Sequence, residues 1–226
     1  MTDYVIPPPA QASLAVHGQA ARFPIHRVFC IGRNYPWTAG EPRPRQMPGW
    51  FMKPATAVVP AEGALPYPPQ TADFCHEVEL VAAIGRAGQD IAPADGQHHI
   101  WGYALGLDMT RRDLQQQAKR EGGSWEPAKA FDHSAPCSPL RAAADIGHPE
   151  AGAIWLSVND TDRQRSDLAE LLWSVPELVA MLSRSVRLLP GDLVFTGTPA
   201  GVGPLLRGDT LRAGIEGIAE ISMQIR

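Results

Sequence analysis

The chain has 226 residues, of which 44% are hydrophobic and 19% charged, and its formal net charge is −4. This composition is typical of a folded globular protein and excludes wholesale disorder and the basic surface of a nucleic-acid-binding protein. No apolar run approaches the roughly 18 residues of a membrane span, and the N-terminal segment MTDYVIPPPAQASLAV does not resemble a signal peptide. Cys30, Cys75 and Cys137 form no CxxC pair, which predicts reduced thiols and a cytoplasmic protein.

The N-terminal part of the chain is rich in strand and turn signals. Residues 1–25 are predicted to form an arm of extended segments with a turn around His17-Gly18, and residues 26–226 a single domain. The apolar residues 28–31 predict a short strand. Segment 33–50 is rich in Pro, Gly and Arg, so it cannot be helical throughout, and it is predicted to be an exposed, lid-like loop.

The rest of the chain alternates strands with short helices. The alternating pattern of residues 76–85, HEVELVAAIG, predicts a strand. A helix is predicted over residues 110–120, with Thr110 as N-cap and Asp113 in the capping-box position, and another over 175–186. Together these elements predict a mixed α+β, β-rich fold, a sandwich or closed roll with a few short helices.

Two glutamates in the strand 76–85 are candidates for a metal site. Successive side chains of a strand point to opposite faces, so Glu77 and Glu79 are predicted to share one side while Val78 and Leu80 face the core. Glutamates at alternate positions also occur on a solvated strand face, and the pair alone does not decide between these interpretations.

Asp108 favours the metal-site interpretation, because it follows the apolar run YALGL and precedes the predicted helix. A carboxylate between a strand and a helix is well placed to meet a ligand, although it could also cap the helix. Three carboxylates without a nearby Cys or His cluster indicate a hard cation, Mg²⁺ or alternatively Mn²⁺ or Ca²⁺.

The order of several motifs resembles the fumarylacetoacetate hydrolase superfamily from about residue 26 to the C-terminus. These motifs are CIGRNY, FMKPA, HEVELVAAIG, GYALGLDMTRRDLQ, AKAFDHSAP, GDLVFTGTPAGVG and GIEGIAEI. The wording of HEVEL and AKAFDHSAP is most similar to the bacterial fumarylpyruvate hydrolases within that superfamily. The resemblance implies a β-rich catalytic domain, a homodimer, a Mg²⁺ site and substrates that are 2,4-diketo acids, or acylpyruvates.

The resemblance also assigns roles to residues by position. It implies metal ligation by Glu77, Glu79 and Asp108 and a catalytic role for Lys129. It implies contact with a small 2-oxo acid substrate for five further residues: Arg33, Tyr35, Arg112, Gln115 and Thr198.

The residue types agree with these roles. Asp108, Arg112 and Gln115 are spaced three or four apart and would share one helix face, from which Arg112 could bind a carboxylate in bidentate fashion. Lys129 lies between two alanines, which is unusual for a solvated lysine, and could stabilise developing negative charge. Without the resemblance, Arg112 could equally form a surface salt bridge, and TGTPAGVG could be a plain hairpin connection.

The lid departs from the pattern of the superfamily, which commonly has His followed by Glu three residues later. Thr38 occupies the position of that His, and Glu41 that of the Glu. A hydroxyl is a poor base at neutral pH, so Glu41, with a pKa raised by desolvation in a closed lid, is the candidate base. His76 and His133 are weaker alternatives, and strand alternation turns His76 away from the ion.

Three functions follow from the residues and the resemblance. The leading hypothesis is a metal-dependent hydrolase that cleaves fumarylpyruvate to fumarate and pyruvate. The missing lid His also favours an oxaloacetate decarboxylase or keto–enol tautomerase, since neither needs activated water. A non-catalytic 2-oxo acid binder is the third.

Overall fold

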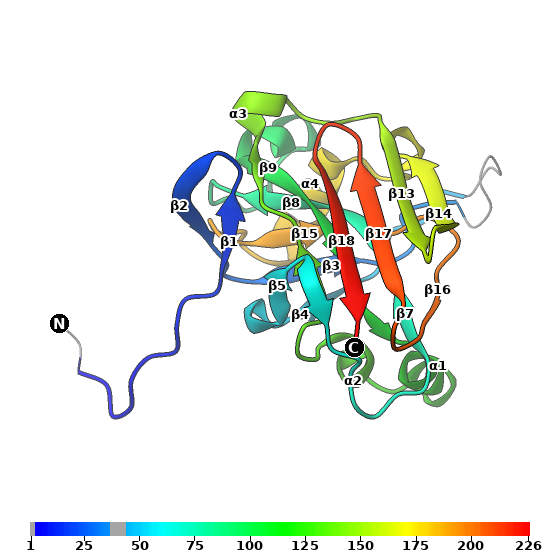
Figure 1. Ribbon diagram of the computed structural model, residues 1–226. Helices are drawn as coiled ribbons and strands as arrows, with labels where there is room; N and C mark the ends of the chain where they lie inside the picture. Colours follow the sequence, from blue (N-terminus) through cyan, green and yellow to red (C-terminus); the bar gives the residue numbers. More distant parts are fainter. Residues whose placement is uncertain (1–2, 37–43) are drawn as a thin grey trace.

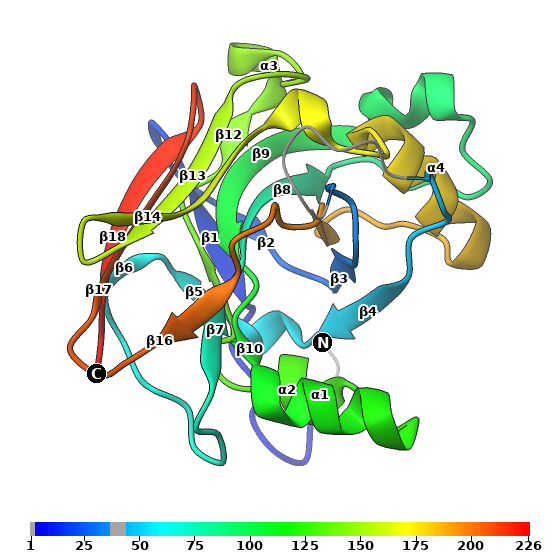
Figure 2. The same ribbon diagram turned by 90° about the vertical axis from the view of Figure 1, so that its right-hand side faces the viewer.

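The computed structural model describes residues 3–36 and 44–226 of the protein, and within them the strands form four sheets (Figure 1). The largest sheet has the order β4-β3-β15-β8-β9-β11-β5, with β12 paired to β9. Its strands are β3 (Val28–Ile31), β4 (Trp50–Lys53), β5 (Val58–Pro60), β8 (Val78–Ile84), β9 (Ile100–Leu107), β11 (Ala135–Cys137), β12 (Arg141–Ala142) and β15 (Leu193–Phe195). The sheet curls strongly along β8 and β9 (Figure 2).

The second sheet has the order β14-β13-β17-β18-β6 and packs against one face of the largest sheet. Its strands are β6 (Glu62–Leu65), β13 (Ala153–Val158), β14 (Thr161–Asp167), β17 (Thr210–Ile215) and β18 (Ala219–Ile225). A three-stranded sheet, β10-β7-β16, consists of β7 (Phe74–His76), β10 (Thr110–Arg111) and β16 (Gly203–Leu205). The fourth sheet is the hairpin of β1 (Ser13–Val16) and β2 (Gln19–Pro24).

The helices are few and short. The α-helices of the described residues are α1 (Arg112–Glu121), α2 (Glu126–Lys129), α3 (Ala143–Ile146) and α4 (Val175–Ser185). Short 3₁₀ turns are η1 (Ala55–Ala57), η2 (Pro93–His99) and η3 (Leu168–Glu170). None of the helices in the described part of the chain is long and apolar enough to span a bilayer. The predicted β-rich fold with a few short helices is therefore confirmed.

The sequence of β8 is almost continuously apolar because both faces of the strand are buried. Leu80 and Ile84 pack into the core shared with the second sheet, whereas Val81 and Ala83 pack on the opposite face. The β1–β2 hairpin covers that opposite face with residues such as Leu14. A strand that is buried on both faces forms a rigid base for any side chain at its end.

The predicted turn of the N-terminal arm is present between β1 and β2. Val16 pairs with Gln19, and Gly18 has a φ of 71°, a left-handed conformation that glycine adopts without steric cost. Residues 3–10, which are exposed, extend away from the body of the molecule (Figure 1).

The predicted single strand over residues 76–85 is wrong in one respect that matters for the site. The strand is interrupted at Glu77: β7 pairs with β10 and β16 in the small sheet, whereas β8 pairs with β9 and β15 in the large one. The neighbouring segment of the chain changes sheets at the same level, between β9 and β10. There the Asp108 amide donates to the Glu77 carbonyl at 2.8 Å. Backbone pairing thus passes from one sheet to the other at a corner.

Helix α1 starts two residues later than predicted, and the predicted capping box is absent. Thr110 lies in β10, paired with Cys75, and the N-cap is Arg111, whose side chain makes no capping bond. Asp113 instead accepts from the Thr71 hydroxyl at 2.6 Å, and so fastens the preceding connector to the helix. The helix ends at Glu121, one residue beyond the predicted range, with Gly122 as its C-cap in the left-handed region.

Candidate active site

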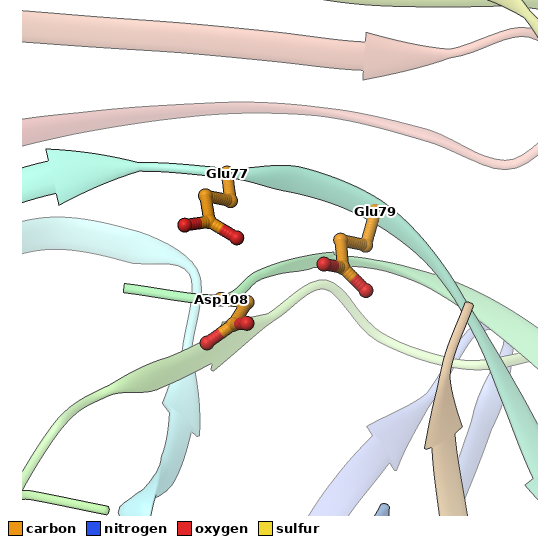
Figure 3. A group of neighbouring side chains, drawn as sticks. All are labelled: Glu77, Glu79 and Asp108. Carbon is orange, nitrogen blue, oxygen red and sulfur yellow. The ribbon is translucent and has the colours of Figure 1, made fainter. Parts of the chain in front are cut away.

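The three candidate metal ligands converge at the corner between the two sheets. Glu77 lies at the break between β7 and β8, Glu79 is in β8, and Asp108 follows β9 (Figure 3). One ligand oxygen from each lies within 4.8 Å of the others. Glu79 and Asp108 are each only 1% exposed and Glu77 is 8% exposed, so a solvated strand face does not describe them. Asp108 does not cap a helix either.

Lys129 of α2 is the central cation of this cluster. Its Nζ lies 2.7 Å from Asp108 Oδ2 and 3.1 Å from Glu77 Oε2, and it donates to Thr110 Oγ1 at 2.6 Å. Burial alone would lower the pKa of Lys129, but Asp108 and Glu77 raise it above its ordinary value. The lysine therefore places a positive charge between these two carboxylates.

Lys53 of β4 is a second buried cation, which the sequence analysis did not assign to the site. Its Nζ lies 2.8 Å from Asp108 Oδ1, donates to the Met109 carbonyl at 3.1 Å, and also donates to the Lys129 carbonyl. Its side chain is fully buried. Lys53 thus supports both a candidate ligand and the backbone of Lys129. A lysine within the apolar segment WFMKPA is the signal that could have revealed it.

Glu79 is the carboxylate that most needs a cation. Burial, together with the charges of Asp108 and Glu77, raises its pKa well above the ordinary value. By contrast, Lys129 and Lys53 overcome the effect of burial on Asp108 and lower its pKa. Three carboxylates converge here, and Glu79 has no ion pair of its own among the described residues. This arrangement fits a hard divalent cation.

The triad lies at the inner end of a cavity of about 260 Å³. The cavity is lined by all the described residues that were predicted to contact substrate or metal: Arg33, Tyr35, Glu77, Glu79, Asp108, Arg112, Gln115, Lys129 and Thr198. Phe51, Lys119 and Trp125 also line it, and none of these three was predicted. The predicted set is therefore brought together around one cavity.

Arg112 and Gln115 share one face of α1, but Asp108 does not share it, because the helix begins at Arg112. Asp108 reaches the same cavity from the end of β9. The Arg112 guanidinium donates to Gln115 Oε1 at 2.9 Å and lies 3.8 Å from Glu77 Oε1. Its side chain is 33% exposed, so it borders both the triad and the open part of the cavity.

Thr198 is held against β8 by a chain of hydrogen bonds. Its hydroxyl donates to the Val78 carbonyl at 2.8 Å and accepts from Gln164 Nε2 at 2.8 Å. Gln164 Oε1 in turn bonds His76 Nδ1 at 2.9 Å. His76 thus bonds Gln164 from the end of β7 and is not among the described residues that line the cavity, and burial lowers its pKa. The loop that carries Thr198 is thus more than a hairpin connection.

Comparison with known proteins agrees with this geometry. The profile of the fumarylacetoacetate (FAA) hydrolase C-terminal family matches residues 27–226. The chain belongs to this family. A Ralstonia fumarylpyruvate hydrolase is 41% identical over 176 residues, which cover 78% of this chain and 91% of that protein. Mouse mitochondrial oxaloacetate tautomerase FAHD1 is 36% identical over 201 residues, covering 88% and 91%.

Among solved structures, Pseudomonas aeruginosa fumarylpyruvate hydrolase in complex with Mn²⁺ and pyruvate superposes with a TM-score of 0.95. It is 49% identical, and the match covers 99% of both chains. The β-rich architecture with curled sheets is therefore that of the FAA hydrolase family. This chain carries an acidic triad that could bind a divalent metal, and a cavity adjoins the triad.

Two residues of the predicted FAA hydrolase lid, Thr38 and Glu41, lie outside the described residues. Arg33, at the start of the lid, has a φ of 65°, which is unusual for a residue other than glycine. Beyond residue 43 the lid leads into β4, which carries Lys53. His133, the other alternative base, is exposed and is not among the described residues that line the cavity.

Proposed function

We propose that the protein is a divalent-metal-dependent hydrolase of acylpyruvates that converts fumarylpyruvate to fumarate and pyruvate. The observation that carries this proposal is the buried triad with Lys129 at the end of a cavity. The relative of known structure that holds Mn²⁺ and pyruvate supports it.

Glu77, Glu79 and Asp108 are the residues that would hold the ion, which we propose to be Mg²⁺, with Mn²⁺ or Ca²⁺ as alternatives of the same ligand preference. When bound, such an ion supplies Lewis acidity toward the oxygens of a 2-oxo acid. The charge of this site agrees with that role, because Glu79 lacks a cationic partner of its own among the described residues.

Lys129 is proposed to stabilise the negative charge that develops on the pyruvyl group as the C–C bond breaks. Its ammonium is already held in place by Asp108, Glu77 and Thr110, so little reorganisation accompanies the reaction. In the overall reaction, the hydroxyl of water adds to the acyl carbon. The bond between that carbon and the neighbouring CH₂ breaks, and the CH₂ takes up a proton.

The remaining cavity residues are proposed to bind and orient the substrate. Arg112 and Gln115 form one donor pair on α1, suited to a carboxylate. Thr198 lines the cavity from the loop after β15, and Arg33 and Tyr35 line it from the segment after β3. We propose Glu41 as the general base, because Thr38 stands where relatives in the family commonly carry His.

Two assays with the purified protein test this function. Incubation with Mg²⁺ and fumarylpyruvate should consume the diketone absorbance and release an equal amount of pyruvate, and EDTA should abolish both changes. A Glu41→Gln variant should retain metal binding while kcat falls by about 10²-fold or more. An unchanged rate would remove Glu41 as the base. Thr38→His should increase hydrolysis if the base limits the rate.

The second candidate function is oxaloacetate tautomerisation or decarboxylation at the same site. The similarity to mouse oxaloacetate tautomerase and the Thr38 substitution favour it. Oxaloacetate should then be enolised or decarboxylated faster than fumarylpyruvate is cleaved. If neither substrate reacts although both raise the melting temperature in the presence of Mg²⁺, the protein is a 2-oxo acid binder.

We also propose that the enzyme is a cytoplasmic homodimer. Its three cysteines are buried and free, which is compatible with a reducing compartment. Light scattering should give twice the chain mass of 24.4 kDa, and a monomeric mass would contradict the dimer.

A further inference from the structure

One face of α1 leads from the triad toward the mouth of the cavity. Arg112, Gln115 and Lys119 follow one another at i, i+3 and i+7, and all three line the cavity. Arg112 stands next to Glu77 at the inner end. Lys119 lies seven residues further, which corresponds to about 10 Å along the helix axis.

The outer part of the cavity gathers positive charge. Lys119 Nζ lies 5.2 Å from the centre of the Trp125 ring, and Arg33 lines the same cavity. Partial desolvation of the exposed Lys119 side chain lowers its pKa, and repulsion from Arg112 and Arg33 lowers it further. Among the described lining residues, the carboxylates are those of the triad, at the other end. An anion bound near Lys119 would relieve this repulsion.

We propose that Lys119 binds a second carboxylate at the acyl end of the substrate and makes the enzyme selective for dicarboxylic acylpyruvates. The proposal rests on the acylpyruvate hydrolase function given above. In fumarylpyruvate six bonds separate the two carboxyl carbons, about 7 Å when extended. If one carboxylate binds at Arg112, the other lies about 7 Å further along the helix face. The long Lys119 side chain can then reach back to it across the remaining distance. Acetylpyruvate lacks the second carboxylate, and oxaloacetate is three bonds shorter.

The residue pair Lys119 and Arg120 offers a matched test. Both are exposed cations at the end of α1, but only Lys119 lines the cavity. Lys119→Met keeps the methylene stem against Trp125 and removes the charge, Lys119→Arg keeps the charge, and Arg120→Met is the control. Steady-state kcat/KM is measured for fumarylpyruvate and acetylpyruvate with saturating Mg²⁺, together with the initial rate on oxaloacetate.

We expect Lys119→Met to lower the ratio of kcat/KM for fumarylpyruvate to that for acetylpyruvate by about 10-fold, mainly through KM. Lys119→Arg should restore most of this ratio, and Arg120→Met should leave it within about twofold. Equal losses on both diketo acids, or an equal effect of Arg120→Met, would overturn the role of Lys119. Failure of the wild-type protein to cleave either diketo acid would instead overturn the proposed function.

Discussion

The two ends of the cavity treat charge in opposite ways. At the inner end, Asp108 is held between the buried ammonium groups of Lys53 and Lys129. At the mouth, the exposed Lys119 side chain lies against the face of the Trp125 ring. Charges at the inner end are thus positioned before any ligand arrives, whereas those at the mouth remain available to it. We therefore expect changes at the inner end to affect catalysis and changes at the mouth to affect substrate selectivity.

The largest expected effect comes from breaking the inner end at its centre. Asp108→Asn removes the partner of two buried lysines, and we expect a loss of about 3–5 kcal/mol in the free energy of unfolding and no measurable turnover. Urea denaturation and pyruvate release measure these two quantities. If the variant does not fold, Glu79→Gln provides the second test, since it should abolish Mn²⁺ binding by calorimetry while leaving Asp108 paired.

Lys129→Met separates catalysis from metal binding. Removing the charge next to the developing negative charge should lower kcat by about 10²–10³-fold with KM nearly unchanged. Mn²⁺ should still bind, because the triad remains. A KM increase with unchanged kcat would contradict a role in catalysis and assign Lys129 to substrate binding.

Lys53→Met and Lys119→Met compare the two ends directly, because each removes one lysine charge, the first at the inner end and the second at the mouth. The Lys53 change should reduce metal affinity or kcat by about 10–100-fold, since it releases Asp108 and the Lys129 carbonyl. It should also destabilise the protein by several kcal/mol, whereas Lys119→Met should change stability by no more than about 0.5 kcal/mol. Similar destabilisation by both variants would show that the two ends do not differ.

Metal removal should have a smaller effect on stability. A divalent ion at about 100 times its Kd stabilises the native state by about 2.7 kcal/mol. For a chain of this size that amounts to a rise of roughly 5–10 °C in Tm over the EDTA-treated protein. The Glu79→Gln variant should show no rise with Mn²⁺. A rise of the same size in that variant would place the ion elsewhere.

The smallest expected effect is that of Thr198→Val. The change removes a hydroxyl that bonds Val78 and Gln164, but Gln164 Nε2 retains the Pro199 carbonyl at 2.9 Å. We expect KM to rise only a few-fold, with kcat unchanged. A large loss of kcat, measured in the same pyruvate assay, would move Thr198 into the reacting end of the cavity.

The features predicted correctly involve residues close together in the sequence, whereas the missed ones involve residues far apart in it. The shared side of Glu77 and Glu79 and the shared face of Arg112 and Gln115 follow from local periodicity, so both were predicted correctly. The role of Lys53 depends on partners far along the chain, at Asp108 and Lys129. The apolar segment around Lys53 marks this lysine as unusual but does not identify those partners.

The errors at the corner have the same physical origin. Thr is a favoured N-cap residue, but the pairing of β10 with β7 places Thr110 in a strand. Likewise the strand break at Glu77 depends on β7 pairing with β16, whose residues lie near the C-terminus. Tertiary pairing thus overrode local propensity at both positions. The residues that the family resemblance named there do converge around one cavity, although the expected helix face for Asp108 was wrong.

The corner at Glu77 also constrains how this chain can diverge. Side chains of β8 alternate between two buried faces, so inserting or deleting one residue after Glu77 would exchange the faces throughout the strand. After a deletion, for example, Leu80 would take the place of Glu79 in the triad, and the Glu79 carboxylate would enter an apolar core. The number of residues between Glu77 and Ile84 therefore has to stay fixed for the triad and both buried faces to persist.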